Sequence, residues 1–180
     1  MILFIDIVIL IVMLINAFWL LCLIIAQVAG SPTVYSNKQA IIDCLKLAGL
    51  KKGETVVDLG CGNARSLIIA ANQFGAKGVG VERSPFCVIH SRLAVWLSGN
   101  SKNIKILSGD FKKAEDYLSD ADVVYLYLLN TTLRKMEDWY FSSIGKQTRT
   151  VSLAFSFGKR EPKETIDTFT LGHNTKARLY

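Results

Sequence analysis

The chain has 180 residues, of which 51% are apolar and 20% charged, and its formal net charge is +6. This length leaves room for one domain beside a short N-terminal segment, so we expect a single domain in these residues. The lysines and arginines form no dense run with interleaved aromatic residues, so we expect no nucleic acid partner. The positive charge favours either attraction to anionic lipid or an ordinary basic surface exposed to solvent.

The first thirty residues predict a transmembrane helix, residues 1–30. No charged residue occurs between Ile7 and Gly30, and only Asn16 and Gln27 in this run are strongly polar. These 24 residues would rise roughly 36 Å as a helix, more than a hydrocarbon core of about 30 Å. A cleavable signal peptide is the alternative. It fits less well, because the apolar run is too long and is preceded by Asp6 rather than by a basic group.

Lysines follow the predicted span but do not precede it. They are Lys38, Lys46, Lys51 and Lys52. Because basic flanks tend to stay in the cytoplasm, we expect a single-pass membrane protein whose globular domain lies on the cytoplasmic side. Cys44, Cys61 and Cys87 form neither a CxxC pair nor a metal-ligand spacing, which suits a reducing compartment and predicts no bound metal.

The rest of the chain predicts an α/β domain. Residues 31–54 predict a linker and a short helix that Ser36 or Asn37 caps and Gly49 ends. Residues 55–180 alternate apolar strands with helices. We expect strands at 55–59, 77–82, 103–107, 121–128 and 150–157, helices at 64–74, 84–97 and 131–144, and a hairpin of 165–171 with 176–180 around a turn at 172–174. This order predicts a mostly parallel sheet that ends in an antiparallel hairpin.

Glycines interrupt the chain directly after the first of these strands. The sequence there is Asp58-Leu59-Gly60-Cys61-Gly62-Asn63-Ala64, at a strand–turn–helix junction. Gly60 and Gly62 permit a tight turn and a close approach of the backbone to a ligand. The helix that follows turns its unpaired N–H groups toward the same place. Two kinds of ligand use such a glycine elbow: dinucleotides and S-adenosyl-L-methionine.

The spacing of the motif separates these two ligands. A dinucleotide fingerprint has glycine or alanine three residues after its second glycine, where this chain has the bulky Arg65. The carboxylate of Asp58 would also repel a pyrophosphate, whereas it tolerates a cationic ligand. The order D-x-G-x-G-x-A resembles instead the first motif of class I methyltransferases, with Ala64 where a third glycine is commoner. An NAD-dependent oxidoreductase is therefore disfavoured.

Two further acids follow the next two predicted strands. Glu82 lies twenty residues beyond Gly62, at a strand end where an acid accepts hydrogen bonds from both ribose hydroxyls. Asp110 and Phe111 follow the third strand, where an acid in methyltransferases commonly recognises the adenine amino group and an aromatic neighbour packs on the base. Each acid alone is more often a solvated strand-end residue. Three of them in register with the glycines predict one pocket for S-adenosyl-L-methionine.

The order of these features resembles the family of small, single-span, seven-strand protein lysine methyltransferases. The shared features are the span, Ser31-Pro32-Thr33-Val34-Tyr35, the capped helix, the glycine elbow, Gly80-Val81-Glu82 and Gly109-Asp110-Phe111. Animal members are mitochondrial and modify lysines of membrane-embedded carrier and ATP-synthase c-subunit proteins. The histone lysine methyltransferases that lack a SET domain are more distantly similar. The resemblance covers nearly the whole chain and implies a Rossmann-like seven-strand domain that methylates a lysine of a protein near the membrane.

The resemblance also implies which residues bind the cofactor. Thr33 and Tyr35 would belong to a loop that closes over its methionyl end, although Tyr35 equally suits an aromatic residue at the membrane interface. The expected cofactor-binding residues are Thr33, Tyr35, Asp58, Gly60, Cys61, Gly62, Asn63, Glu82, Asp110 and Phe111.

The acceptor side is less determined. After the fourth strand the chain lacks the Asn/Asp-Pro-Pro-aromatic motif of enzymes that methylate planar nitrogen, which argues against adenine and glutamine acceptors. Asn130 either orients an acceptor amine or, as we favour, caps the next helix, and Tyr35 is the second acceptor-side candidate. Methyl transfer from a sulfonium needs mainly alignment and removal of water, so no general base is required. His90 and His173 are expected to be structural or surface residues.

Three functions remain open on these grounds. The leading one is a membrane-anchored, S-adenosyl-L-methionine-dependent enzyme that N-methylates a protein lysine. A methyltransferase for a lipid or a small membrane-soluble molecule would use the same cofactor site. A non-catalytic cofactor-binding membrane protein would keep the fold, although the intact set of glycines and acids weighs against it.

Overall fold

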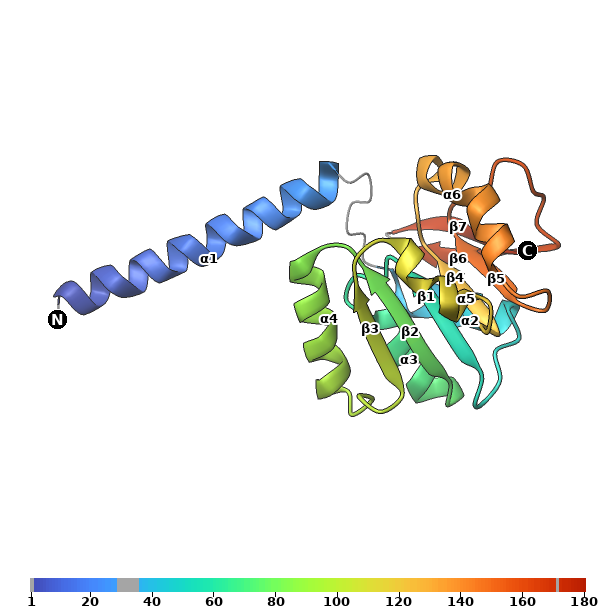
Figure 1. The fold of residues 1–180 in the computed structure, drawn as a ribbon, viewed down its shortest axis with the longest axis horizontal. Coiled ribbons are helices and arrows are strands. Elements are labelled where there is room, and N and C mark those ends of the chain that lie inside the picture. The colour runs from blue at the N-terminus through green and yellow to red at the C-terminus, as the bar shows by residue number, and fades with distance from the viewer. Residues whose placement is uncertain (1, 29–35, 171) are drawn as a thin grey trace.

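The structure, a computed structural model, describes residues 2–28, 36–170 and 172–180 (Figure 1). The helices are α1 (Ile2–Val28), α2 (Lys38–Leu47), α3 (Arg65–Phe74), α4 (Pro85–Leu97), α5 (Glu115–Leu118) and α6 (Asn130–Ser143), with a 3-10 turn η1 (Phe111–Ala114). The strands are β1 (Thr55–Leu59), β2 (Lys77–Glu82), β3 (Ile104–Ser108), β4 (Val123–Leu126), β5 (Arg149–Leu153), β6 (Glu164–Thr170) and β7 (His173–Leu179).

The strands form one seven-stranded sheet in the order β3-β2-β1-β4-β5-β7-β6. The first five strands pair in parallel, and β7 pairs antiparallel with both β5 and β6. The predicted α/β fold with a C-terminal antiparallel hairpin is therefore confirmed. The chain runs outward from β1 through β2 to β3 and then returns to the other side of β1 as β4. The carboxyl ends of β1 and β4 therefore meet where the strand order reverses, which is where open α/β sheets bind ligands.

Several predicted boundaries differ from the structure. The fifth strand ends at Leu153 rather than at 157, because Ala154 adopts a left-handed φ of 65° that turns the chain out of the sheet. The hairpin turn is tighter than expected: His173 already pairs with Thr170, so the predicted turn at 172–174 is wrong beyond Gly172. Residues 111–118 form η1 and α5, for which no element was predicted.

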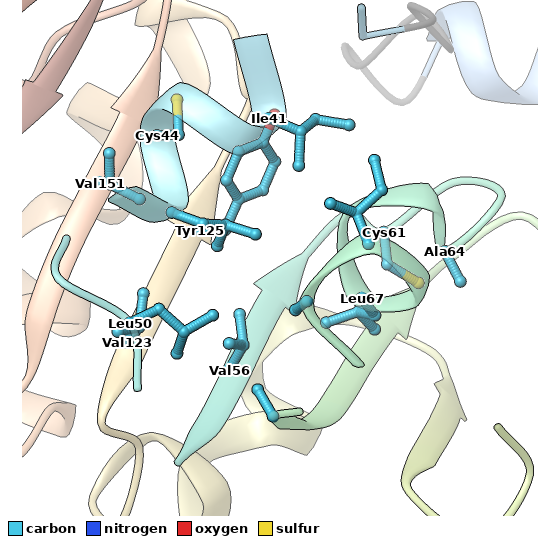
Figure 2. Packing of buried hydrophobic residues seen from close by; sticks show 14 of the residues in the cluster. Ile41, Cys44, Leu50, Val56, Cys61, Ala64, Leu67, Val123, Tyr125 and Val151 are labelled. Atoms are coloured by element: carbon cyan, nitrogen blue, oxygen red, sulfur yellow. The ribbon is translucent and has the colours of Figure 1, made fainter. Parts of the chain in front are cut away.

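The hydrophobic core lies on both faces of the sheet. Neighbouring side chains of β1 alternate between them, so Val56 and Val57 belong to separate buried clusters. Helices α2, α3 and α4 cover the face of Val56, and η1, α5 and α6 cover the face of Val57. Figure 2 shows Ile41 and Cys44 of α2 packing beside Tyr125 of β4. The packing on both faces fixes the strand ends that carry the predicted site.

Helix α1 lies apart from this core (Figure 1). The side chains from Phe4 to Leu21 are exposed, and the mean hydropathy of these 18 residues is 2.6. By length and composition, α1 is the one helix in the described part of the chain that could cross a membrane. Asp6 falls inside this helix rather than before it, and residues 29 and 30 of the predicted span lie outside the described residues.

Candidate functional site

The predicted acids and glycines meet at one edge of the sheet. Strand register aligns Leu59 with Val81 and Glu82 with Ser108, so the chain leaves β1, β2 and β3 at the same edge. The N–H of Gly109 donates to the carbonyl oxygen of Glu82 over 2.9 Å, which ties the end of β3 to the end of β2. The elbow, Glu82 and Asp110 therefore lie at the same carboxyl end of the sheet, as a shared pocket requires.

The glycine elbow is held by the neighbouring strand. The N–H groups of Gly60 and Cys61 both donate to the carbonyl oxygen of Val81, over 2.8 and 3.0 Å. Gly60 and Gly62 have φ values of 86° and 53°, which side chains with a Cβ rarely adopt. Ala64 follows with a φ of 59° although it is not glycine, at the position where the methyltransferase motif commonly has its third glycine. The left-handed φ at Ala64 is a conformation that glycine, the commoner residue at this position of the motif, adopts readily.

A glycine of the next strand leaves room for the elbow. A Cβ placed on Gly80 would lie 2.6 Å from the Sγ of Cys61 and 2.9 Å from Cδ1 of Leu67. Figure 2 shows Cys61 and Leu67 beside each other in the buried layer. Cys61 is thus a packing residue, and burial raises the pKa of its thiol well above its usual range. Because the Cys61 side chain is buried in the core, this residue presents its backbone, and not its thiol, to a ligand at the elbow.

Both carboxylate oxygens of Glu82 accept hydrogen bonds from backbone. Oε2 accepts from the N–H of Gly62 over 3.0 Å, and Oε1 accepts from the N–H of Ser84 over 2.8 Å. Each carboxylate oxygen retains a second lone pair. The carboxylate is therefore fixed in orientation and still able to accept two hydroxyl hydrogen bonds.

Asp58 is a buried acid, with 4% of its surface exposed. Burial raises the pKa of its carboxyl to about 7, against a hydrogen bond from the Ser66 hydroxyl that lowers it, and the nearby charge of Glu82 raises it further. The sequence reasoning missed Ser66. Its position in the first turn of α3 was the available signal, because that turn faces back toward the strand that precedes it.

Asn63, Asp110 and Phe111 complete the elbow's surroundings. The Oδ1 of Asn63 accepts from the N–H of Arg65 over 3.2 Å, and the Oδ1 of Asp110 accepts from the N–H of Lys112 over 3.3 Å. Asp110 is exposed and caps η1, whose first residue, Phe111, lies beside the elbow. A Cβ on Gly60 would lie 3.9 Å from Cε1 of Phe111. Phe111 thus offers an apolar ring next to the glycines.

The structure describes one of the two acceptor-side candidates, Asn130. The other candidate, Tyr35, and the predicted cofactor-binding residue Thr33 lie outside the described residues. Asn130 is the first residue of α6, but the capping position is Leu129 and carries no side-chain capping bond, so the favoured capping role is wrong. The Oδ1 of Asn130 instead accepts from the N–H of Ser156 over 3.0 Å. Asn130 therefore ties the start of α6 to the loop after β5.

An aromatic pair that the sequence reasoning missed lies in the same region. Tyr127, just after β4, stacks with Phe155, just after β5, with ring centroids 5.9 Å apart. Neighbouring Leu128 borders the elbow, because a Cβ on Gly60 would lie 3.1 Å from its Cδ2. The signal in the sequence was an aromatic residue near the end of each of the fourth and fifth predicted strands. The pair gives the carboxyl edge an apolar wall one strand beyond the acids.

The two histidines are not among these acids and aromatic rings, although His90 lines a groove together with Asn63 of the elbow. His90 is exposed on α4 and stacks with Phe86 at 6.4 Å, and His173 is an exposed residue of β7. Among the residues that the structure describes, no cluster of histidine, cysteine and acidic side chains is arranged to hold a metal ion.

The chemistry of this edge suits a ligand with a cationic end, two hydroxyls and an apolar ring. The acids fit these parts in order along the sheet, with Asp58 buried under the elbow, Glu82 directed by two N–H groups, and Asp110 beside Phe111. S-adenosyl-L-methionine has such parts. A pyrophosphate would meet two carboxylates here, which repel it.

Comparison with known proteins gives the family. A model of the ANTKMT methyltransferase domain matches residues 58–164. A protein-lysine N-methyltransferase of Saccharolobus islandicus is 28% identical over 150 residues, which cover 83% of this chain and 92% of that protein. The adenine nucleotide translocase lysine N-methyltransferase of Mus musculus is 29% identical over 136 residues, which cover 75% of this chain and 58% of that protein.

Solved structures agree with this family. An RNA methyltransferase from Salinibacter ruber, in complex with S-adenosyl-L-homocysteine, is 31% identical with a TM-score of 0.73, covering 81% of this chain and 93% of that one. A methyltransferase from Thiobacillus denitrificans, also with S-adenosyl-L-homocysteine, shares the fold at 18% identity and a TM-score of 0.55, covering 74% of this chain and 50% of that one. Since the family model matches more than half of the chain, the protein belongs to the ANTKMT methyltransferase domain family and is a class I enzyme that uses S-adenosyl-L-methionine.

Proposed function

We propose that this methyltransferase N-methylates a lysine of a protein held close to a membrane. The observation that carries the proposal is the similarity to two relatives named as protein-lysine N-methyltransferases, which extends over at least 75% of this chain. The absence of a proline-containing motif after β4 also favours an amine acceptor over a planar nitrogen.

In this proposal the carboxyl edge holds the cofactor. Glu82 accepts the ribose hydroxyls with the lone pairs that Gly62 and Ser84 leave open. Asp58 attracts the cationic methionyl end of the cofactor. The first N–H groups of α3 face the carboxylate of the methionyl group. Asp110 and Phe111 take the adenine. When bound, S-adenosyl-L-methionine supplies a methyl group on a sulfonium, which is already a good leaving group.

The residues next to this edge would prepare the acceptor. Tyr127 and Phe155 form an apolar wall that excludes water from the lysine amine, and removal from water lowers the pKa of an ammonium group. The amine then loses its proton before transfer without a dedicated base. Asn130 contributes indirectly, because its bond to the Ser156 N–H holds the loop that carries Phe155.

Helix α1 would anchor this domain to the bilayer as a single span, with residues 31–54 as linker and short helix and 55–180 as the cofactor-binding domain. The lysines that follow α1 favour the cytoplasmic side for the domain. Anchoring would confine the enzyme to acceptors within reach of the membrane, which suits the membrane-facing role that the family resemblance implies.

The test is to incubate the full chain, together with membranes, with methyl-labelled S-adenosyl-L-methionine. The expected result is a labelled protein band whose hydrolysate contains methyllysine, and strongly reduced label with the cofactor-site variant Glu82→Gln when the cofactor is kept below saturation. Label that partitions only into organic solvent would instead identify a lipid or a small membrane-soluble acceptor. Label in RNA would extend to this chain the acceptor named for the Salinibacter ruber protein, and no transfer despite cofactor binding would leave a non-catalytic protein.

A further inference from the structure

Helix α4 presents apolar side chains to solvent on the side that faces away from the sheet. Its inner face packs on the core through Val88 and Val95. The exposed residues of the outer face are Ile89 (63% exposed), Leu93 (50%), Trp96 (67%) and Leu97 (70%). Their spacing of three and four residues places them along one stripe of the helix. We call these four residues the α4 stripe.

Basic side chains lie beside the stripe. A groove of about 350 Å³ separates α4 from α3 and is lined by His90 and Ala94 of α4 and by residues of α3 that include Arg65 and Asn72. Lys38, the first residue of α2, lines the same groove. An apolar helix face with cationic groups at its border is the pattern of a helix that lies in the interface of an anionic bilayer.

The position of α1 points to the same partner. Nine residues separate Val28 from Lys38, and even fully extended they reach only about 30 Å. Helix α4 is in contact with α1, and Figure 1 shows α4 at the side of the domain nearest to α1. If α1 crosses a bilayer, the α4 stripe is therefore held within reach of the lipid surface.

We propose that the α4 stripe docks the catalytic domain on the phospholipid bilayer. Ile89, Leu93 and Leu97 enter the boundary between headgroups and acyl chains, and Trp96 lies at the interface that indole side chains prefer. Lys38 and Arg65 face the lipid phosphates. This inference rests on the proposed anchoring by α1, and it adds a second, separate contact that fixes how the domain is turned.

Docking through α4 would orient the active edge. Pro85 begins α4 three residues after Glu82, and the N–H of Ser84, the residue whose side chain caps α4, donates to the Glu82 carboxylate. A helix held flat on the membrane would therefore hold the cofactor edge at a fixed height above it. Acceptor lysines at that height would be reached, and lysines farther from the membrane would not.

The chain offers its own reporters, because its three tryptophans lie in different places: Trp19 in α1, Trp96 in the stripe and Trp139 on α6 at the opposite face of the sheet. We would prepare three full-length proteins, each keeping one tryptophan and carrying phenylalanine at the other two positions. Each is reconstituted in anionic phospholipid vesicles with and without brominated acyl chains, which quench tryptophan fluorescence on contact.

The expected result is loss of fluorescence from Trp19 and Trp96 in brominated lipid, and no loss from Trp139. Quenching of Trp19 without quenching of Trp96 would overturn docking through α4 and leave the anchor standing. No quenching of Trp19 would overturn the anchor itself. If Trp96 were shielded from an aqueous quencher but not quenched by brominated lipid, a second copy of the chain would cover the stripe, and bilayer docking would be wrong.

A matched pair of substitutions tests the cause. Leu93→Glu places a charge in the exposed stripe, whereas Ser142→Glu places one at an exposed position of α6. We expect Leu93→Glu to abolish the quenching of Trp96, Ser142→Glu to leave it unchanged, and both variants to bind S-adenosyl-L-homocysteine in detergent as the parent protein does. Unchanged quenching of Trp96 in Leu93→Glu would overturn the proposal.

Discussion

The backbone N–H of Gly62 donates to the Glu82 carboxylate over 3.0 Å, which joins the tip of the glycine elbow to the end of the neighbouring strand. The same carboxylate accepts from Ser84 and so also fixes the start of α4. One acid thereby holds two chain segments in place before any ligand arrives. A cofactor that bonds to Glu82 meets an oriented group and loses less free energy to ordering it.

We expect Glu82→Gln to weaken the binding of S-adenosyl-L-homocysteine roughly 10- to 100-fold, because a hydrogen bond to a charged group contributes about 1.5–3 kcal/mol. The amide has only one oxygen, so it cannot accept from both Gly62 and Ser84 and also from two hydroxyls. Calorimetric titration measures the loss. Asp138→Asn, at an exposed acid paired with Lys159, is the control and should bind as the parent protein does.

The buried acid Asp58 makes stability depend on pH. Its folded pKa of about 7 lies above the usual 3.8, so the folded protein holds a proton that the unfolded chain has already lost. The free energy of unfolding therefore falls as pH rises from about 4 to about 7 and stays level above that. Asp58→Asn should remove this dependence and stabilise the ligand-free protein at pH 8 by up to about 4 kcal/mol, while it loses affinity for S-adenosyl-L-methionine.

Thermal unfolding at pH 4.5 and at pH 8 checks this prediction. The difference in Tm between variant and parent should be small at the lower pH and largest at the higher one. An equal difference at both would mean that Asp58 keeps an ordinary pKa in the folded protein.

Gly80→Ala should displace the elbow from the adjacent strand. The added Cβ would lie 2.6 Å from the Sγ of Cys61, so either the elbow or β2 must move. We expect a loss of about 1–3 kcal/mol of stability from overpacking and a clear loss of cofactor affinity. Gly78→Ala is the matched control in the same strand, since its Cβ would meet only Leu67 and Ile104 at 3.2 Å or more. Equal effects on affinity would contradict a role specific to the elbow.

The gathering of the acids could be predicted because it depends on sheet geometry alone. Parallel strands bring their carboxyl ends to one edge, so the sequence positions of Asp58, Glu82 and Asp110 sufficed. The Ser66 hydroxyl could not be predicted as firmly, because its bond to Asp58 depends on how α3 turns on the sheet. The sequence likewise gave no sign that an alanine, Ala154, would adopt a positive φ and end β5 early.

The role of Asn130 shows where local preference fails. Asparagine at the start of a helix favours capping, and the prediction followed that preference. In the structure the side chain bonds instead to the Ser156 N–H, a residue 26 positions later that only the fold brings near. A contact across the sheet edge overrides a local tendency worth about 1 kcal/mol, and no pattern within α6 reveals it.

Glu137 is a buried acid with a structural role. It is 1% exposed on α6, and its carboxylate accepts from the N–H groups of Gly158 and Lys159 over 2.9 and 3.0 Å. Glu137→Ala should lower the free energy of unfolding by about 1–3 kcal/mol, since it leaves these N–H groups without their acceptor. Chemical denaturation measures the change. Binding of S-adenosyl-L-homocysteine should persist at temperatures where the variant is folded, and its loss there would place Glu137 in the cofactor site.

The aromatic pair predicts a separation between cofactor binding and methyl transfer. Phe155→Ala removes one of the two stacked rings and opens the wall beside the acceptor to water, while Asp58, Glu82 and the elbow keep their contacts. We expect the affinity for S-adenosyl-L-homocysteine to stay within about twofold of the parent value, which corresponds to less than about 0.5 kcal/mol. The rate of transfer should fall by roughly tenfold or more at neutral pH, because the better solvated amine keeps its proton.

Raising the pH should then increase the transfer rate of the variant more than that of the parent protein, because solvent removes the proton from the amine at higher pH. Transfer assays between pH 7 and pH 9 measure this pH dependence. Phe141→Ala, which removes an aromatic ring from α6, is the control that distinguishes an effect on the acceptor's proton from a general loss of packing. A rate that falls equally at every pH would mean that Phe155 positions the acceptor without affecting its proton.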